Sequence, residues 1–178
     1  ISAWVTPLAA LEGVRVAGVV QEPPPLPHLA RVPGEPWGLA LDLAVDMWPG
    51  PTAPTTVSTT SFADIYWQFP QQIAHLTSNY ATLRTGDLLA SGTVSGPDPG
   101  SQGSLLELTD GWRHPLRLTA AGPNVERAFL EAGDSIRLRG SAAVAPGVTL
   151  ALGDVFGRIS GGWGIGRCAS RDGGRDGG

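Results

Sequence analysis

One carboxylate in this sequence has a setting that suits chemistry: Glu107 lies among leucines in the stretch "SLLEL". If this stretch is a strand, alternation places Glu107 on the same face as Leu105 and opposite the two other leucines. The carboxylate is then partly buried and needs hydrogen-bonding partners to stay ionised. Such a group suits orienting a histidine or polarising a water molecule. An ordinary surface glutamate is the alternative, and the residues alone leave both open.

The loop before this stretch, "ASGTVSGPDPGSQG", carries Thr93 and Ser95 between glycines. Glycine lets the backbone and a neighbouring hydroxyl approach a ligand closely. We predict no helix after the loop, so it is not a phosphate-binding loop of the strand–loop–helix type. A plain hairpin loop between two short strands is the other interpretation.

Other reactive side chains are sparse. Histidines 28, 75 and 114 are scattered, with no carboxylate spacing typical of a metal site. We expect His75 to be a packed histidine beside an apolar stripe rather than a ligand. The single cysteine, Cys168, excludes a disulfide framework and a zinc-ligand cluster and favours a reducing, cytoplasmic setting. From the residues alone, the chain is not a self-sufficient catalytic unit.

Composition excludes further classes of function. The formal net charge is -4 and no basic cluster occurs, so we expect no nucleic-acid binding. No apolar run approaches the roughly 20 residues that cross a bilayer, so we expect no membrane association. The 25 glycines and 16 prolines favour many turns between short strands. Residues 21–38, which hold six of the prolines, predict an extended connection, with a PxxP ligand as the less favoured alternative.

Periodicity predicts the elements that would position these residues. Apolar residues alternate with small or acidic ones over residues 37–47, which predicts a strand. Asp42 and Asp46 share one face of it; metal ligands are conceivable, but we interpret them as a solvated face. Further strands are predicted at residues 88–90, 104–108, 134–139 and 148–155.

One amphipathic helix is predicted over residues 62–76, where apolar residues recur at three and four positions. Thr60 or Ser61 offers a cap, and Pro70 should either kink the helix or begin a second one. Together these elements predict a single mostly-β domain with one prominent helix. The chain opens at Ile1 in a core-like run with Trp4, Val5 and Leu8, so we expect preceding sequence to be missing. Residues 160–178, with eight glycines, are expected to be a disordered tail.

A series of short motifs in the middle of the chain resembles the C-terminal half of the fumarylacetoacetase family. The motifs are Tyr66-Trp67, Gln71-Gln72 with His75, Asn79, "LRTGDLL" (83–89), "SGTVSG" (91–96) and "GSLLEL" (103–108). The likeness covers about residues 2–159. It implies that residues 1–159 are the C-terminal portion of a catalytic domain with a mixed β-sandwich or β-roll fold.

The resemblance implies hydrolysis of the carbon–carbon bond of 4-fumarylacetoacetate to fumarate and acetoacetate, in tyrosine and phenylalanine breakdown. In this family Mg²⁺ or Ca²⁺ holds the diketone, a His–Glu pair activates water, and the enzyme is a homodimer. Thr93 matches the threonine that contacts substrate, and Glu107 matches the glutamate that orients the catalytic histidine. The catalytic histidine, the metal ligands and the substrate-binding Lys and Arg are expected upstream of Ile1, so no metal ligand is assigned here.

Two alternatives remain at this stage. Related hydrolases, decarboxylases and isomerases of the same superfamily tend to have Thr-Gly-Thr-Pro where this chain has "SGTV", so another activity within the superfamily is possible. The missing ligands favour a second alternative, a non-catalytic remnant domain that binds a partner.

Overall fold

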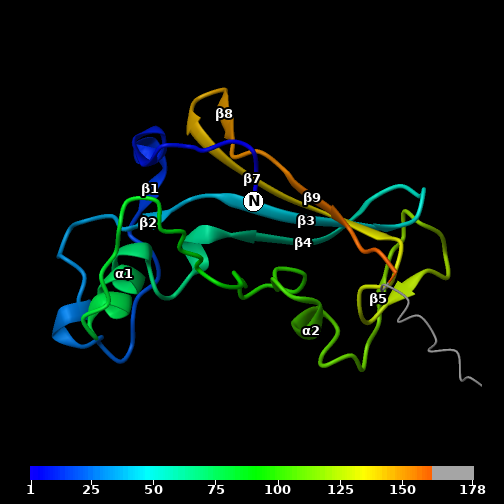
Figure 1. Cartoon of the computed structure of the whole chain (residues 1–178), viewed down its shortest axis with the longest axis horizontal. Coiled ribbons are helices and arrows are strands. Elements are labelled where there is room, and N and C mark those ends of the chain that lie inside the picture. The colour runs from blue at the N-terminus through cyan, green and yellow to red at the C-terminus, as the bar shows by residue number, and fades with distance from the viewer. Residues whose placement is uncertain (162–178) are drawn as a thin grey trace, which may run out of the picture.

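The computed structural model describes residues 1–161 and is built on one open antiparallel sheet (Figure 1). The strand order is β4-β3-β7-β8, and β9 also pairs with β7. These strands are β3 (Asp42–Pro49), β4 (Thr55–Ser61), β7 (Asp134–Ala145), β8 (Val148–Ala151) and β9 (Val155–Arg158). Two two-stranded ribbons complete the strands: β1 (Arg15–Val16) with β2 (Gly38–Leu39), and β5 (Leu116–Arg117) with β6 (Glu126–Arg127). The mostly-β prediction is confirmed.

The helices are short and lie beyond the β4 edge or near the chain start (Figure 1). They are η1 (Leu8–Val14), η2 (Pro27–Leu29), η3 (Phe62–Asp64), α1 (Phe69–Thr77) and α2 (Leu105–Leu108). The predicted helix over residues 62–76 is two elements, because Ile65 leaves helical geometry after η3. Ser61 caps η3, as one of the two predicted caps. Pro70 lies in the first turn of α1, which confirms the prediction that it begins a second helix. Within residues 1–161 no helix is both long and apolar enough to cross a membrane.

The strand predicted over residues 37–47 is interrupted. Its first part pairs with β1 rather than with the large sheet, and Ala40 and Leu41 belong to neither ladder before β3 begins. The solvated face proposed for the two aspartates holds for Asp42, which is exposed, and is wrong for Asp46, which is buried. Asp46 lies opposite Arg137 across the β3–β7 ladder and pairs with its guanidinium. The burial of Asp46 therefore depends on a residue 91 positions away in the sequence.

Two predicted strands are wrong. Residues 88–90 form no strand, since no other segment of the described chain pairs with them. Residues 104–108 form helix α2: the Ser104 hydroxyl accepts from the backbone N–H of Glu107, and the Ser104 carbonyl accepts from Leu108. This serine cap stabilises a helical turn where alternation predicted extended backbone. The strand predicted over 134–139 is confirmed and longer; the one over 148–155 breaks into β8 and the start of β9.

Two hydrophobic clusters lie against the sheet. The first is Leu11, Val14, Leu39, Leu41, Phe62 and Ala142, and the second is Met47, Val57 and Leu118. Trp4, Val5 and Leu8 were predicted to be core residues, but they are exposed, Trp4 by 77% and Val5 by 92%. Trp4 and Val5 precede η1 and join neither hydrophobic cluster, and η1 turns only its later residues, Leu11 and Val14, toward the core. The predicted disordered tail lies outside the described residues except for Ser160 and Gly161.

The proline-rich connection is fixed to α1 by Gln71, whose side chain is only 1% exposed. Its Nε2 donates to Gln21 Oε1 and to the Leu29 carbonyl, both at 2.8 Å. Its Oε1 accepts from the Gln68 N–H at 3.0 Å and from Gln21 Nε2 at 3.2 Å. The Gln71 side chain therefore supplies hydrogen-bond partners both to the start of α1 and to the proline-rich connection.

Gln71→Leu should lower the free energy of unfolding by about 2 kcal/mol, because it leaves buried donors and acceptors without partners. Gln72→Leu is the matched control: this side chain makes one exposed bond, to the Trp67 carbonyl, and its loss should cost about 0.5 kcal/mol or less. Urea unfolding followed by tryptophan fluorescence compares the two variants. Equal losses would contradict the role given to Gln71.

Candidate active site

Glu107 lies in the only turn of α2, with its carboxylate held by two serine hydroxyls. Ser104 Oγ donates to Glu107 Oε2 at 2.7 Å. Ser95 Oγ lies 3.0 Å from Oε1 and 3.1 Å from Oε2 of the same carboxylate. The expected partial burial beside Leu105 is wrong, because in a helical turn Glu107 points to solvent. The predicted need for hydrogen-bonding partners is met by hydroxyl groups instead.

Thr93 and Glu107 line one cavity of about 420 Å³. Three segments form it: the η3–α1 junction, the loop over residues 91–95, and α2. Its lining residues are Asp64, Ile65, Tyr66, Trp67, Gln72, Ser91, Thr93, Val94, Ser95 and Glu107. The structure thus brings together the two site residues predicted from sequence, which are 14 positions apart in the chain. We call this cavity the Glu107 pocket.

Close packing at Gly103 joins the two sides of the Glu107 pocket. The Gly103 N–H donates to Ser95 Oγ at 3.0 Å. A Cβ at Gly103 would lie 2.6 Å from Thr93 Cγ2 and closer still to the Val94 carbonyl oxygen. Space, rather than an unusual backbone angle, therefore requires glycine at this position. The backbone at Gly103 packs directly against Thr93 and Val94, and this contact fixes the position of Thr93.

Gly103→Ala should displace Thr93 and lower the free energy of unfolding by about 1–3 kcal/mol, because the added methyl group overlaps backbone. Gly157→Ala in β9 is the matched control, since a Cβ there meets no atom within 4 Å. Chemical shifts of the Thr93 methyl group and urea unfolding report the two effects. An unshifted Thr93 methyl resonance in Gly103→Ala would contradict the packing argument.

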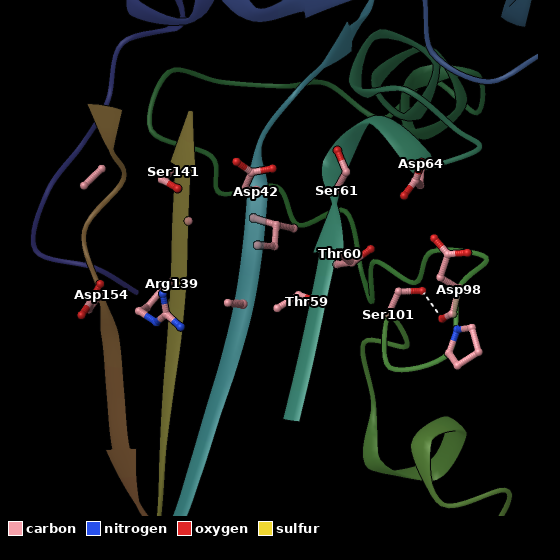
Figure 2. A pocket seen from close by; sticks show the side chains of 15 residues that line it. Asp42, Thr59, Thr60, Ser61, Asp64, Asp98, Ser101, Arg139, Ser141 and Asp154 are labelled. Atoms are coloured by element: carbon pink, nitrogen blue, oxygen red, sulfur yellow. Dashed lines mark hydrogen bonds between the residues drawn. The ribbon is translucent and has the colours of Figure 1, made fainter. Parts of the chain in front are cut away.

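A second cavity, of about 600 Å³, lies over the sheet between β7, β3 and β4 (Figure 2). Figure 2 shows Asp42 and Ser141 on neighbouring strands, with Asp64 and Asp98 beyond the β4 edge. Among the described residues that line it, the one cationic side chain is Arg139, and its guanidinium is paired with Asp46. Most of the side chains that line this cavity are polar, but the one positive charge among them is already paired.

A third cavity, of about 950 Å³, adjoins the Glu107 pocket through shared Tyr66, Trp67, Gln72 and Ser91. His75 and His28 line it, together with prolines 23–25. The expectation that His75 is packed is wrong: its side chain is exposed, because α1 presents that face to the cavity rather than to the core. None of the three histidines lines the Glu107 pocket.

No group of three or more His, Cys, Asp or Glu side chains within residues 1–161 is placed to hold a metal ion. In the Glu107 pocket only Asp64 and Glu107 are acidic, and Glu107 already accepts from two hydroxyls. The donor set of the described chain therefore does not fit a resident divalent cation.

Sequence reasoning offered Ser95 only as a hydroxyl that could approach a ligand, did not connect it to Glu107, and assigned no role to Ser104. One signal was present: Ser104 and Glu107 have the Ser-x-x-Glu spacing of a helix capping box. That spacing predicts a helix start and a Ser–Glu contact. No sequence pattern connects Ser95 to Glu107, because that contact depends on how the loop folds back over 12 residues.

Comparison with known proteins places these residues in a family context. Residues 1–166 match the family "Fumarylacetoacetate (FAA) hydrolase C-terminal". The chain is 39% identical over 160 residues to fumarylacetoacetase of Arabidopsis thaliana and 39% over 160 residues to that of Caenorhabditis elegans. It is 36% identical over 160 residues to that of Homo sapiens. Each match covers 89% of this chain but only 36–37% of the relative, so the chain spans little more than a third of the length of these relatives.

Proposed function

This chain belongs to the fumarylacetoacetate hydrolase family, and on that basis we propose that it is the C-terminal part of an enzyme that hydrolyses 4-fumarylacetoacetate. The products are fumarate and acetoacetate, and the reaction belongs to tyrosine and phenylalanine breakdown. The observation that carries the proposal is the meeting of Thr93 and Glu107 in one pocket, at positions that match the family motifs. Activity belongs to the whole enzyme, because the chain spans little more than a third of the length of the matched relatives.

The two residues have distinct roles in the proposed reaction. Glu107 accepts a hydrogen bond from a histidine N–H that the rest of the enzyme supplies, and so orients that histidine toward a water molecule. The hydroxyl of Thr93 donates to a substrate oxygen. The histidine takes a proton from the water, and the resulting hydroxide adds to the carbonyl carbon. The carbon–carbon bond then breaks, and the leaving acetoacetate carbon takes up the proton that the histidine received.

The Mg²⁺ or Ca²⁺ expected for this family finds no ligand set among residues 1–161. We therefore assign the metal to the remainder of the enzyme and route no step through it here. A homodimer and a cytoplasmic location are part of the same proposal. The family resemblance supports the homodimer, and the single cysteine supports the location.

The test uses the complete gene product that contains this chain. 4-Fumarylacetoacetate is supplied with Mg²⁺ or Ca²⁺, and its absorbance is followed while fumarate is measured separately. Equal amounts of substrate lost and fumarate formed are expected. Loss of an acylpyruvate but not of 4-fumarylacetoacetate would overturn the substrate and favour another activity of the superfamily.

A second candidate, a non-catalytic role for this chain on its own, is favoured by the lack of a metal-binding group among the described residues. It predicts no turnover by the 178-residue chain with substrate and divalent cation in excess. Any metal-dependent consumption of substrate by this chain alone would overturn it.

A further inference from the structure

We infer that Ser95 and Ser104 are positioning residues that fix the Glu107 carboxylate as a hydrogen-bond acceptor; this rests on the proposed function. An exposed glutamate side chain ordinarily samples many rotamers. Here two hydroxyl groups from different segments contact its carboxylate oxygens at 2.7–3.1 Å. The two hydroxyls therefore restrict the rotamers of an exposed carboxylate, as packing restricts those of a buried one.

The direction of each hydrogen bond follows from counting protons. A serine hydroxyl has one proton to donate. Ser95 Oγ already accepts the Gly103 N–H at 3.0 Å, so its own proton is left for Glu107. Ser104 Oγ accepts the Glu107 N–H at 3.3 Å, so its proton likewise goes to the carboxylate. Both hydroxyls are thus donors to Glu107.

A carboxylate surrounded by donors is suited to one role. Oε2 takes contacts from both serines, whereas Oε1 takes one, so acceptor capacity remains mainly on Oε1. This geometry leaves Oε1 of Glu107 able to accept an N–H from a histidine.

Ser95 also couples Glu107 to Thr93. It lies two residues after Thr93 in the same loop, and its Oγ accepts from Gly103 at the start of the turn that leads into α2. One hydroxyl thus fixes the loop that carries the substrate-contacting threonine and the carboxylate opposite it. Ser95 is the residue on which the arrangement depends most.

The experiment is a double-mutant cycle in the complete enzyme, with Ser95→Ala, Glu107→Gln and both together. Ser95→Ala should lower kcat by about 10- to 100-fold with KM changed less than about 3-fold. In the Glu107→Gln background the same substitution should change kcat less than about 2-fold, because Ser95 acts through Glu107. Ser95→Thr, which keeps the hydroxyl, should restore most of kcat.

Thr52→Ala is the control. Its hydroxyl donates to the Pro49 carbonyl at 2.8 Å in the loop between β3 and β4, and its loss should leave kcat unchanged. A wild-type enzyme that leaves 4-fumarylacetoacetate intact overturns the proposed function. An active wild type in which Ser95→Ala keeps full kcat, or lowers it equally in both backgrounds, overturns only the positioning role. Ser104→Ala, expected to lower kcat as well, gives a second check that does not alter Ser95.

Discussion

Replacing Asp46 with alanine is expected to lower the free energy of unfolding by about 3 kcal/mol, because it removes the shared partner of two arginines. Asp46 is 2% exposed. Arg137 donates to its Oδ2 through Nε at 2.9 Å and Nη2 at 2.7 Å. Arg139 donates through Nε at 2.7 Å to Oδ2 and through Nη2 at 2.9 Å to Oδ1.

The size of the effect depends on what the two arginines do when Asp46 is gone. Their side chains are 37% and 40% exposed, so water solvates part of each unpaired charge. This places the expected loss at the low end of the range for broken buried pairs. Thr56, whose hydroxyl donates to Asp46 Oδ1 at 2.8 Å, also loses its acceptor.

Asp46 should also make stability depend on pH in the acid range. The hydrogen bond from Arg139, aided by those from Thr56 and Arg137, holds the pKa of the Asp46 carboxyl well below its usual range. In the unfolded chain the Asp46 carboxyl has the ordinary pKa of about 3.9, so it takes up a proton there before it does so in the folded protein as the pH falls. The stabilisation is therefore complete above about pH 5 and is lost progressively as the pH falls below that value. Asp46→Ala should lack this part of the acid dependence.

Asp42→Ala is the matched control for Asp46→Ala. Asp42 lies on the same face of β3, four residues earlier, but is exposed. Its loss should change the free energy of unfolding by about 0.5 kcal/mol or less. Urea unfolding at pH 7 and at pH 3 measures both effects. An Asp46→Ala variant as stable as Asp42→Ala at pH 7 would show that the arginine pair contributes nothing to the fold.

Asp46 also shows where prediction from sequence ends. Alternation placed it correctly on the face of β3 opposite Met47. Alternation cannot tell which residues of a distant strand lie opposite, because a long stretch of chain that includes β4, α1 and α2 separates β3 from β7. Only the register, with Asp46 opposite Arg137, makes the aspartate a buried ion-pair partner.

The sequence motifs named two residues of the candidate site but did not predict the local conformation that holds them. Thr93 and Glu107 came from short motifs, and the structure places both in one pocket. The local conformation at Glu107 was wrong, since leucines in "SLLEL" suit a strand by alternation and a helix by their propensity. The serine cap at Ser104 decides between the two. Close approach at Gly103 could not be predicted, because spacing carries no information about how near two backbone segments lie.

The largest effect on activity is expected from Glu107→Gln, which should lower kcat of the complete enzyme by about 10²- to 10⁴-fold. The amide keeps the size of the side chain but has one oxygen in place of two. The Ser95 and Ser104 hydroxyls, both donors here, then compete for one acceptor, and an NH₂ group faces the histidine N–H that Glu107 is proposed to accept. KM should change little, because Glu107 is assigned to the histidine rather than to the substrate.

The fold should tolerate Glu107→Gln, since Glu107 is exposed and outside both hydrophobic clusters. The control is Glu126→Gln, which removes a surface carboxylate that pairs with Arg117 at 3.0 Å. Neither Glu126 nor Arg117 lines the Glu107 pocket. That variant should keep kcat within about 2-fold. Steady-state kinetics with 4-fumarylacetoacetate compares the three enzymes. A Glu107→Gln enzyme as active as Glu126→Gln would mean that the carboxylate only holds the Ser95 and Ser104 hydroxyls, and catalysis would then have to be assigned to groups outside this chain.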